Sequence, residues 1–221
     1  MKKNGQGGFD LESDKKRALA LTPVSRETEK RLDMFVEALL LGQSKFNLVA
    51  SSTLPQIWTR HIADSLQLLP LASEARVWVD FGSGAGFPGI AIACALADTP
   101  GVMVHLVESV GKKANFLREV VSALALPARV HQERAEKFEE TCAETVHVVT
   151  ARALAPLKTL CDQTFPLIAK GAVGLFPKGQ DVAAELTESA KYWRLEASTV
   201  PSVTNPASAI VVVRGLKRLE K

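Results

Sequence analysis

A glycine-rich segment at residues 80–89 limits most strongly what this chain can fold into. Its sequence, DFGSGAGFPG, lies between a strand pattern at 77–81 and a helical pattern at 88–97. Glycines in a strand-to-helix turn let the backbone bend sharply and approach a ligand closely, and a helix amino terminus favours an electron-rich group. The segment therefore predicts a β-α-β unit with a ligand at its first turn.

The chain after residue 76 alternates short β-branched runs with helical patterns, which is typical of helices around a parallel sheet. Strands are predicted at 77–81, 102–107, 128–132, 146–150, 172–176 and 209–213, with a further one near 192–199. Helices are predicted at 88–97, 110–124, 155–169 and 181–190. The fold class is therefore α/β, with a mostly parallel, doubly wound sheet whose ligand edge lies at the carboxyl ends of the strands.

The front third of the chain has a different pattern. Residues 1–22 are polar, with basic residues at 15–17, and predict a flexible basic arm. Apolar residues at helical spacing predict a helix that starts at Ser25 and stops at Gly42, and a second helix over 53–69. The predicted organisation is an arm at 1–22, a helical extension at 23–72 and an α/β domain at 73–221.

Composition excludes several classes of protein. The net charge is only +3, from 27 basic and 24 acidic residues, which argues against a tail-driven nucleic-acid binder. Three widely spaced cysteines argue against a disulfide scaffold or a cysteine metal site. The first 20 residues lack the apolar core of a signal peptide, and no apolar run approaches the roughly 20 residues of a membrane helix. We expect a cytoplasmic protein with no metal and no membrane contact.

The glycine segment can be interpreted in two registers. Gly84, Gly86 and Gly89 satisfy G-x-G-x-x-G, the pattern of dinucleotide-binding proteins. Asp80 followed by glycines at 82, 84 and 86 resembles the D-x-G-x-G-x-G form of S-adenosylmethionine-dependent methyltransferases and starts directly after the strand. Glu108 ends the second predicted strand, where a carboxylate can accept hydrogen bonds from both ribose hydroxyls of an adenosine-containing cofactor of either kind.

Basic side chains follow successive predicted strands. Arg134, Arg152 and Lys178 each lie a few residues past a strand's carboxyl end, and Lys112 and Lys113 lie in the first turn of a predicted helix, where they oppose its dipole. This arrangement favours a polyanionic substrate. Further basic residues near the carboxyl terminus are expected to add to the same basic edge: Arg214, Lys217, Arg218 and Lys221.

From about Phe46 to Lys178 the chain resembles the bacterial 16S ribosomal RNA guanine-N7 methyltransferases, also called ribosomal RNA small subunit methyltransferase G or glucose-inhibited division protein B. The segments that carry the resemblance are RHIADS at 60–65, DFGSGAGFPG at 80–89, ESVGKK at 108–113, Phe116-Leu117, RAE at 134–136, Arg152-Ala153 and Lys178-Gly179. Two positions depart from the family pattern, Val49 and Ala91.

The resemblance implies a Rossmann-like methyltransferase fold with an N-terminal helical extension, and S-adenosylmethionine as cofactor. The cofactor-binding residues it implies, together with the acid and glycines of the loop, are Asp80, Gly82, Gly84, Gly86, Phe87, Glu108, Ala135, Glu136 and Arg152. The expected RNA-binding residues are Arg60, His61, Lys112, Lys113, Arg134 and Lys178. Arg152, Arg134 and Lys178 are expected to position the substrate, with no general base. The expected partner is 16S ribosomal RNA or the small ribosomal subunit, bound by a monomer.

Two other classes remain open from the sequence. A nicotinamide-dependent oxidoreductase would use the G-x-G-x-x-G register of Gly84, Gly86 and Gly89. A non-catalytic RNA-binding protein would use the glycine loop as a structural turn only.

Overall fold

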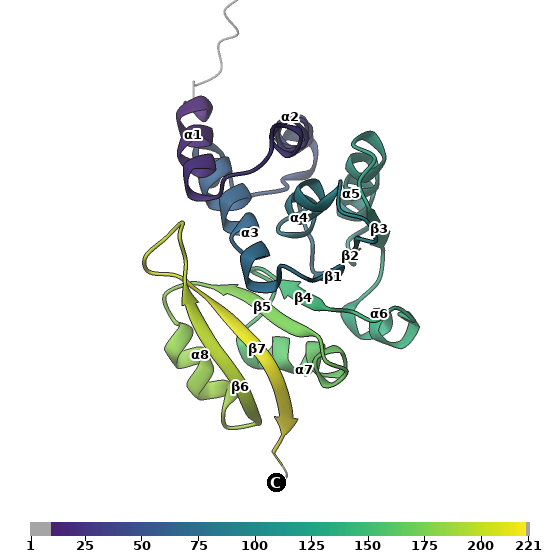
Figure 1. The fold of residues 1–221 in the computed structure, drawn as a ribbon, viewed down its shortest axis with the longest axis vertical. Coiled ribbons are helices and arrows are strands. Elements are labelled where there is room, and N and C mark those ends of the chain that lie inside the picture. The colour runs from purple at the N-terminus through teal and green to yellow at the C-terminus, as the bar shows by residue number, and fades with distance from the viewer. Residues whose placement is uncertain (1–9, 220–221) are drawn as a thin grey trace, which may run out of the picture.

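The computed structural model describes residues 10–219, which form a seven-stranded sheet with helices on both faces (Figure 1). The strand order is β3-β2-β1-β4-β5-β7-β6; β1 to β5 are parallel and β7 is antiparallel to both of its neighbours. The strands are β1 (Val77–Phe81), β2 (Met103–Val107), β3 (Ala128–His131), β4 (Val148–Ala151), β5 (Val173–Lys178), β6 (Trp193–Pro201) and β7 (Ala209–Arg218). The predicted fold class is confirmed.

Each parallel strand is followed by a helix. These helices are α4 (Gly89–Leu96), α5 (Gly111–Ala123), α6 (Ala135–Thr141), α7 (Leu157–Ala169) and α8 (Val182–Ser189). Helix α6 was missed by the sequence analysis, because only Ala135 and Phe138 of its seven residues are buried and the segment shows no apolar periodicity. No helix within residues 10–219 is long and apolar enough to cross a membrane.

The sheet separates two hydrophobic cores. One core packs the N-terminal helices, α4 and α5 against one face, and the other packs α6 and α7 against the opposite face. Figure 1 shows this division, with α1 to α5 above the sheet and α6 to α8 below it. The N-terminal helices therefore share a core with the sheet.

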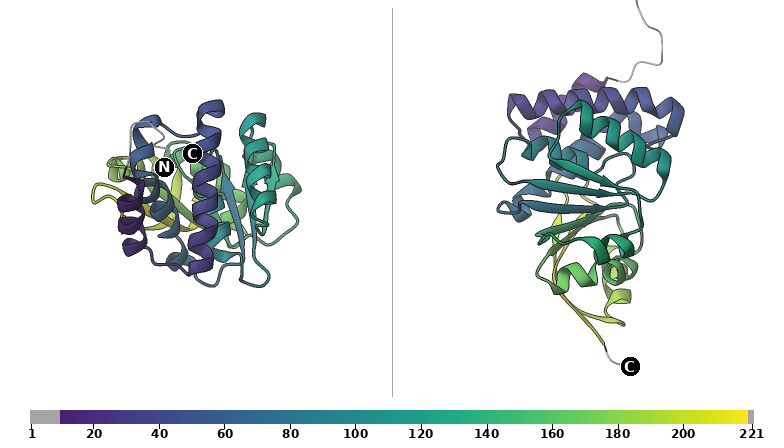
Figure 2. Two further views of the ribbon diagram at one scale, coloured as in Figure 1. Left: turned by 90° about the horizontal axis from the view of Figure 1, so that it is seen from above. Right: turned by 90° about the vertical axis from the view of Figure 1, so that its right-hand side faces the viewer.

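The expected flexible arm is wrong from residue 11 onward, because α1 (Leu11–Leu21) is a docked helix; residues 1–9 lie outside the described residues. Ala18 is fully buried, and the buried Asp14 carboxylate accepts hydrogen bonds from the backbone N–H groups of Trp58 and Thr59 at 2.9 and 3.2 Å. The charged residues of this segment therefore include one acid, Asp14, that docks the helix onto the rest of the protein. The right-hand view of Figure 2 shows α1 and α2 at the end of the molecule opposite the end of β7.

Helix α2 (Arg26–Phe46) begins where predicted, with the Ser25 hydroxyl accepting from the Thr28 N–H at 3.1 Å. The predicted stop at Gly42 is wrong. Gly42 lies inside the helix, and its lack of a side chain leaves room for neighbours, since a Cβ there would lie 3.1 Å from Leu48 and 3.2 Å from Phe116. The helix ends instead at Asn47, which adopts a left-handed conformation.

The helix predicted over 53–69 is broken into short turns. Pro55 has no N–H to donate, and Asp14 takes the N–H groups of Trp58 and Thr59 that a continuous helix would use. The turns are a 3-10 helix (Ser51–Gln56), a π-helix (Trp58–Ala63), α3 (Asp64–Leu66) and a second 3-10 helix (Leu69–Ala72).

Candidate active site

The strand order reverses between β1 and β4, and two segments leave the sheet at that point. The glycine loop follows β1, and the segment 152–156 follows β4. In open α/β sheets, ligands bind in the crevice outside the carboxyl ends of the strands where the order reverses. The candidate site therefore lies between these two segments.

Asp80, near the end of β1, supports the glycine loop through hydrogen bonds of its side chain. Its buried carboxylate accepts hydrogen bonds from the Gly89 N–H and the Thr150 hydroxyl, both at 3.0 Å. Burial raises its pKa to about 6, although these hydrogen bonds oppose the shift. A Cβ at Gly89 would lie 2.2 Å from Leu106 and 2.8 Å from the Asp80 carboxylate, so only glycine fits there. Asp80 thus fixes the start of α4.

Glu108 ties the end of β2 to the glycine loop. One carboxylate oxygen accepts from the Gly84 N–H at 2.9 Å and the other from the Val110 N–H at 2.7 Å. The side chain is buried, so both oxygens are held in fixed positions beside the loop.

A cleft of about 190 Å³, here called the glycine cleft, opens beside this loop. It brings together residues that follow four different strands, and four of the predicted cofactor or substrate residues are near it. Its lining is Gly82, Val107, Ser109, Glu133, Arg134, Ala135, Glu136, Leu154 and Gln163.

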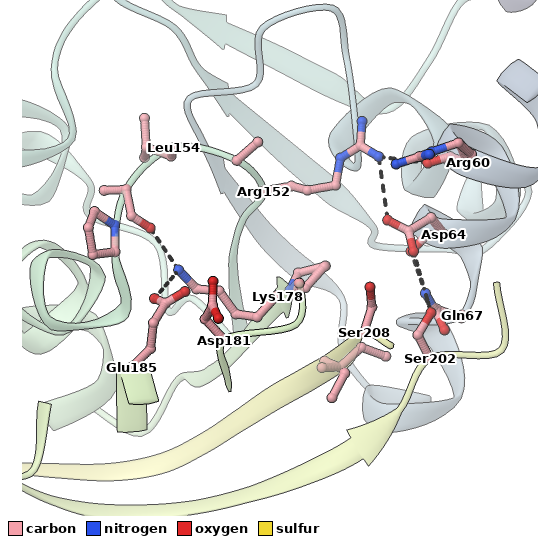
Figure 3. A pocket seen from close by; sticks show the side chains of 17 residues that line it. Arg60, Asp64, Gln67, Arg152, Leu154, Lys178, Asp181, Glu185, Ser202 and Ser208 are labelled. Carbon is pink, nitrogen blue, oxygen red and sulfur yellow. Dashed lines mark hydrogen bonds and ion pairs between the residues drawn. The ribbon is translucent and has the colours of Figure 1, made fainter. Parts of the chain in front are cut away.

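A second cavity of about 650 Å³, here called the β4–β5 pocket, lies on the other side of the segment 152–156 (Figure 3). It contains both signs of charge: Arg60, Arg152 and Lys178 line it together with Asp64, Asp181 and Glu185. The end of β5, the start of β7 and the segment 153–156 supply further parts of its wall.

Arg152 is held by the N-terminal helical region. It donates to the Arg60 carbonyl at 3.0 Å, lies 3.4 Å from the Asp64 carboxylate and sits 5.2 Å above the Phe87 ring. It also donates to Nδ1 of His61 at 2.7 Å, and the His61 ring stacks on Phe87. Figure 3 shows Arg152 turned toward Arg60 and Asp64 across the pocket.

Lys178 is also engaged within the protein. Its ammonium donates to the Ala155 carbonyl at 2.7 Å and pairs with Glu185 at 2.8 Å, and only 9% of its side chain is exposed. Glu185 in turn accepts from the Leu157 N–H at 2.5 Å. This pair therefore holds the α7 end of the turn between β4 and α7.

The predicted basic residues do not all meet at one edge. Arg134 lines the glycine cleft, Arg152 and Lys178 line the β4–β5 pocket, and Lys112 and Lys113 begin α5. The expectation for the carboxyl-terminal bases is wrong. Because β7 runs antiparallel to β5, with Ala209 opposite Lys178, residues 214–218 lie past the other end of β5; Lys221 is outside the described residues.

Sequence reasoning missed three residues that shape the site: Asp64, Leu154 and Glu185. Asp64 belongs to the RHIADS segment that carries the family resemblance, and Leu154 follows the end of the strand at 146–150, so each had a signal in the sequence. Glu185 lies on α8 and reaches the site only through the tertiary fold.

Residues 28–211 match the family model described as rRNA small subunit methyltransferase G. A protein from Bradyrhizobium sp. (strain ORS 278) named "Ribosomal RNA small subunit methyltransferase G" is 56% identical over 95% of this chain and 94% of its own length. A protein of the same name from Rhodopseudomonas palustris (strain HaA2) is 52% identical over 90% of this chain and 84% of its own.

Solved structures with the same fold are distant in sequence. An O-methyltransferase from Bacillus cereus in complex with SAH is 13% identical, with a TM-score of 0.59 over 91% of this chain and 96% of that chain. A putative O-methyltransferase from Klebsiella pneumoniae is 11% identical, with a TM-score of 0.58 over 91% of this chain and 96% of that chain. At this identity the likeness concerns the fold alone.

Proposed function

The chain belongs to the rRNA small subunit methyltransferase G family, and from that membership we propose that it transfers a methyl group from S-adenosylmethionine to N7 of a guanine in 16S ribosomal RNA. The observation that carries the proposal is the glycine cleft after β1 adjoining the β4–β5 pocket. Family membership leaves the nicotinamide-dependent oxidoreductase and the non-catalytic RNA-binding protein without support.

The residues that line the glycine cleft, and those that support its loop, suit this cofactor. Gly82 presents backbone without a side chain, as a close ligand approach requires. Each Glu108 oxygen accepts one backbone hydrogen bond and keeps a further lone pair for a ribose hydroxyl. Ala135 and Glu136 form the facing wall. Asp80, Gly84, Gly86 and Phe87 would act by shaping the loop, and Arg152 by supporting Phe87. When bound, the cofactor supplies an electrophilic methyl group on a sulfonium sulfur.

The proposed reaction needs no proton transfer before attack. Guanine N7 carries a free lone pair at neutral pH, so the chain's task is to align the base, exclude water and leave N7 unbonded. Good alignment alone can contribute up to about 7–11 kcal/mol. An arginine that reads the base should therefore donate to guanine O6 and not to N7. Arg134 is exposed at the glycine cleft and forms no ion pair with any residue from 10 to 219, so it is free to position the RNA from that side.

Four of the predicted RNA-binding residues have no acidic partner within residues 10–219 and fit contacts to RNA phosphate: Arg60, Lys112, Lys113 and Arg134. His61 is packed against Phe87 and Arg152, so we assign it an indirect role. Lys178 is proposed to position the turn after β4. A ribosomal RNA substrate also fits the expected cytoplasmic location and a monomer that binds the small subunit.

Tritiated methyl transfer to unmethylated 16S RNA and to assembled small subunits, followed by mapping of the modified base, tests the proposal. We expect one labelled guanine that becomes labile to the strand scission specific for N7-methylated guanine. Label on another base, or on an exocyclic or ring nitrogen other than N7, would contradict it. Comparing the two substrates identifies the assembly state that the enzyme uses.

A further inference from the structure

Leu154 is the one side chain that lines both cavities of the site among the residues described. It faces the glycine cleft with Gly82 and Arg134, and it faces the β4–β5 pocket with Arg152 and Lys178. Figure 3 shows it on the lining of the larger pocket, in the segment that follows Arg152. It thus forms a wall between the two spaces.

The Leu154 side chain covers the face of Gly82 that a ligand in the glycine cleft would otherwise contact. A Cβ placed on Gly82 would lie 2.6 Å from one Leu154 methyl carbon, so that methyl group already rests against the glycine. Leu154 is nevertheless 40% exposed and does not belong to either hydrophobic core. Leu154 can therefore move away from Gly82 without disrupting the packing of either hydrophobic core.

The backbone next to it is unusual. Ala153 has a φ of 52°, in the left-handed region that residues with a side chain rarely adopt. The segment is anchored at both ends, by Arg152 on one side and by the Lys178 contact to the Ala155 carbonyl on the other. The two anchors leave Leu154 as the free tip of a short, fixed turn.

Direct methyl transfer requires the methyl carbon and the acceptor nitrogen to approach within about 3–3.5 Å in line. A cofactor in the glycine cleft and a base in the β4–β5 pocket cannot meet while Leu154 stands between them. On the basis of the proposed function, we infer that Leu154 is a movable wall: it leaves Gly82 when the cofactor binds and then packs against the target base, which occupies the β4–β5 pocket.

The test measures cofactor affinity and turnover separately in Leu154→Ala. Removing the side chain removes the closed state, so S-adenosylhomocysteine should bind about 3- to 10-fold more tightly by titration calorimetry, as expected when a competing conformation is abolished. The kcat for 16S RNA methylation should fall about 10-fold with KM for RNA little changed, because the base loses its wall. Leu154→Met should restore turnover, and Leu41→Ala, at a 70% exposed leucine on α2, should change neither quantity.

Weaker or unchanged S-adenosylhomocysteine binding in Leu154→Ala would overturn the inference, because a fixed wall or an inert surface residue would give those results. Thermal unfolding of each variant checks that the fold is intact. The binding measurement needs no RNA, so a wild-type protein that binds S-adenosylhomocysteine but methylates neither 16S RNA nor assembled small subunits would refute the proposed function and still test the movable wall.

Discussion

Arg152 donates a hydrogen bond to Nδ1 of His61 over 2.7 Å, and this contact joins the turn after β4 to the helical region that precedes β1. A guanidinium can only donate, so a neutral His61 must carry its proton on Nε2, which lies 2.9 Å from the Thr53 hydroxyl. Burial, and next the positive charge of Arg152, lower the pKa of His61 to about 3.

Acid should destabilise the protein through His61. Its unfolded pKa is about 6.5, so between pH 6.5 and 3 the unfolded chain binds more protons than the folded one, and stability is lost as the pH falls through this window by up to about 1.4 kcal/mol per unit. His61→Asn keeps an acceptor for Arg152 but does not titrate. Between pH 7 and pH 5, denaturant unfolding of the wild type should lose about 1–2 kcal/mol more than the variant loses.

Asp80 should matter for stability more than for cofactor contact. Asp80→Ala leaves the buried Gly89 N–H and Thr150 hydroxyl without their acceptor, and we expect the free energy of unfolding to fall by about 1–3 kcal/mol. Asp80→Asn retains an acceptor for Gly89 and should recover most of that loss in denaturant titrations at pH 7. Equal losses in both variants would show that the hydrogen bonds are not the cause.

Substitution of Gly82 should weaken cofactor binding, whereas substitution of a glycine away from the site should not. Gly82→Ala combines a φ of 67° with a Cβ that meets Leu154 at 2.6 Å, and it should weaken S-adenosylhomocysteine binding more than 10-fold. Gly101→Ala is the matched control, because Gly101 has a φ of 75° and no heavy atom within 4 Å of its Cβ position. Both variants should lose about 1 kcal/mol of stability, and only the first should lose affinity. Calorimetric titration of the two proteins gives the answer.

Lys178 can act on RNA or on the turn after β4, and its partner Glu185 separates the two roles. If the pair holds the turn, then Lys178→Ala and Glu185→Gln should both lower kcat for RNA methylation several-fold and leave S-adenosylhomocysteine affinity within about 2-fold. If Lys178 binds phosphate, Glu185→Gln should free the ammonium and raise activity instead. Single-turnover methylation of both variants distinguishes these outcomes.

The sequence predicted the sheet well because β1, β2 and β4 are buried along nearly their whole length and the strands are bounded by turn residues. The strand at 77–81 was predicted to the residue, and the Asp80 loop followed from its position after that strand. The docking of α1 could not be predicted, because it depends on Asp14 reaching amide groups 44 and 45 residues away. Lys178 and Arg152 were predicted to lie near the site because each follows the carboxyl end of a parallel strand. Their carboxylate partners lie on α8 and α3, and no local sequence pattern specifies how those helices pack.

Salt should weaken RNA binding through a few identifiable side chains and leave S-adenosylhomocysteine binding nearly unchanged. Each lysine or arginine that contacts phosphate releases counterions, so removing one should reduce the slope of log affinity against log salt by about 0.7–0.9. Arg60→Ala, Lys112→Ala and Arg134→Ala should each show this reduction in filter-binding titrations with 16S RNA fragments. Lys217→Ala is the control, because Lys217 is an equally exposed base at the other end of β7 and should leave the slope unchanged. A slope that responds to Lys217 and not to Arg134 would place the RNA on the far end of the sheet and contradict the proposed site.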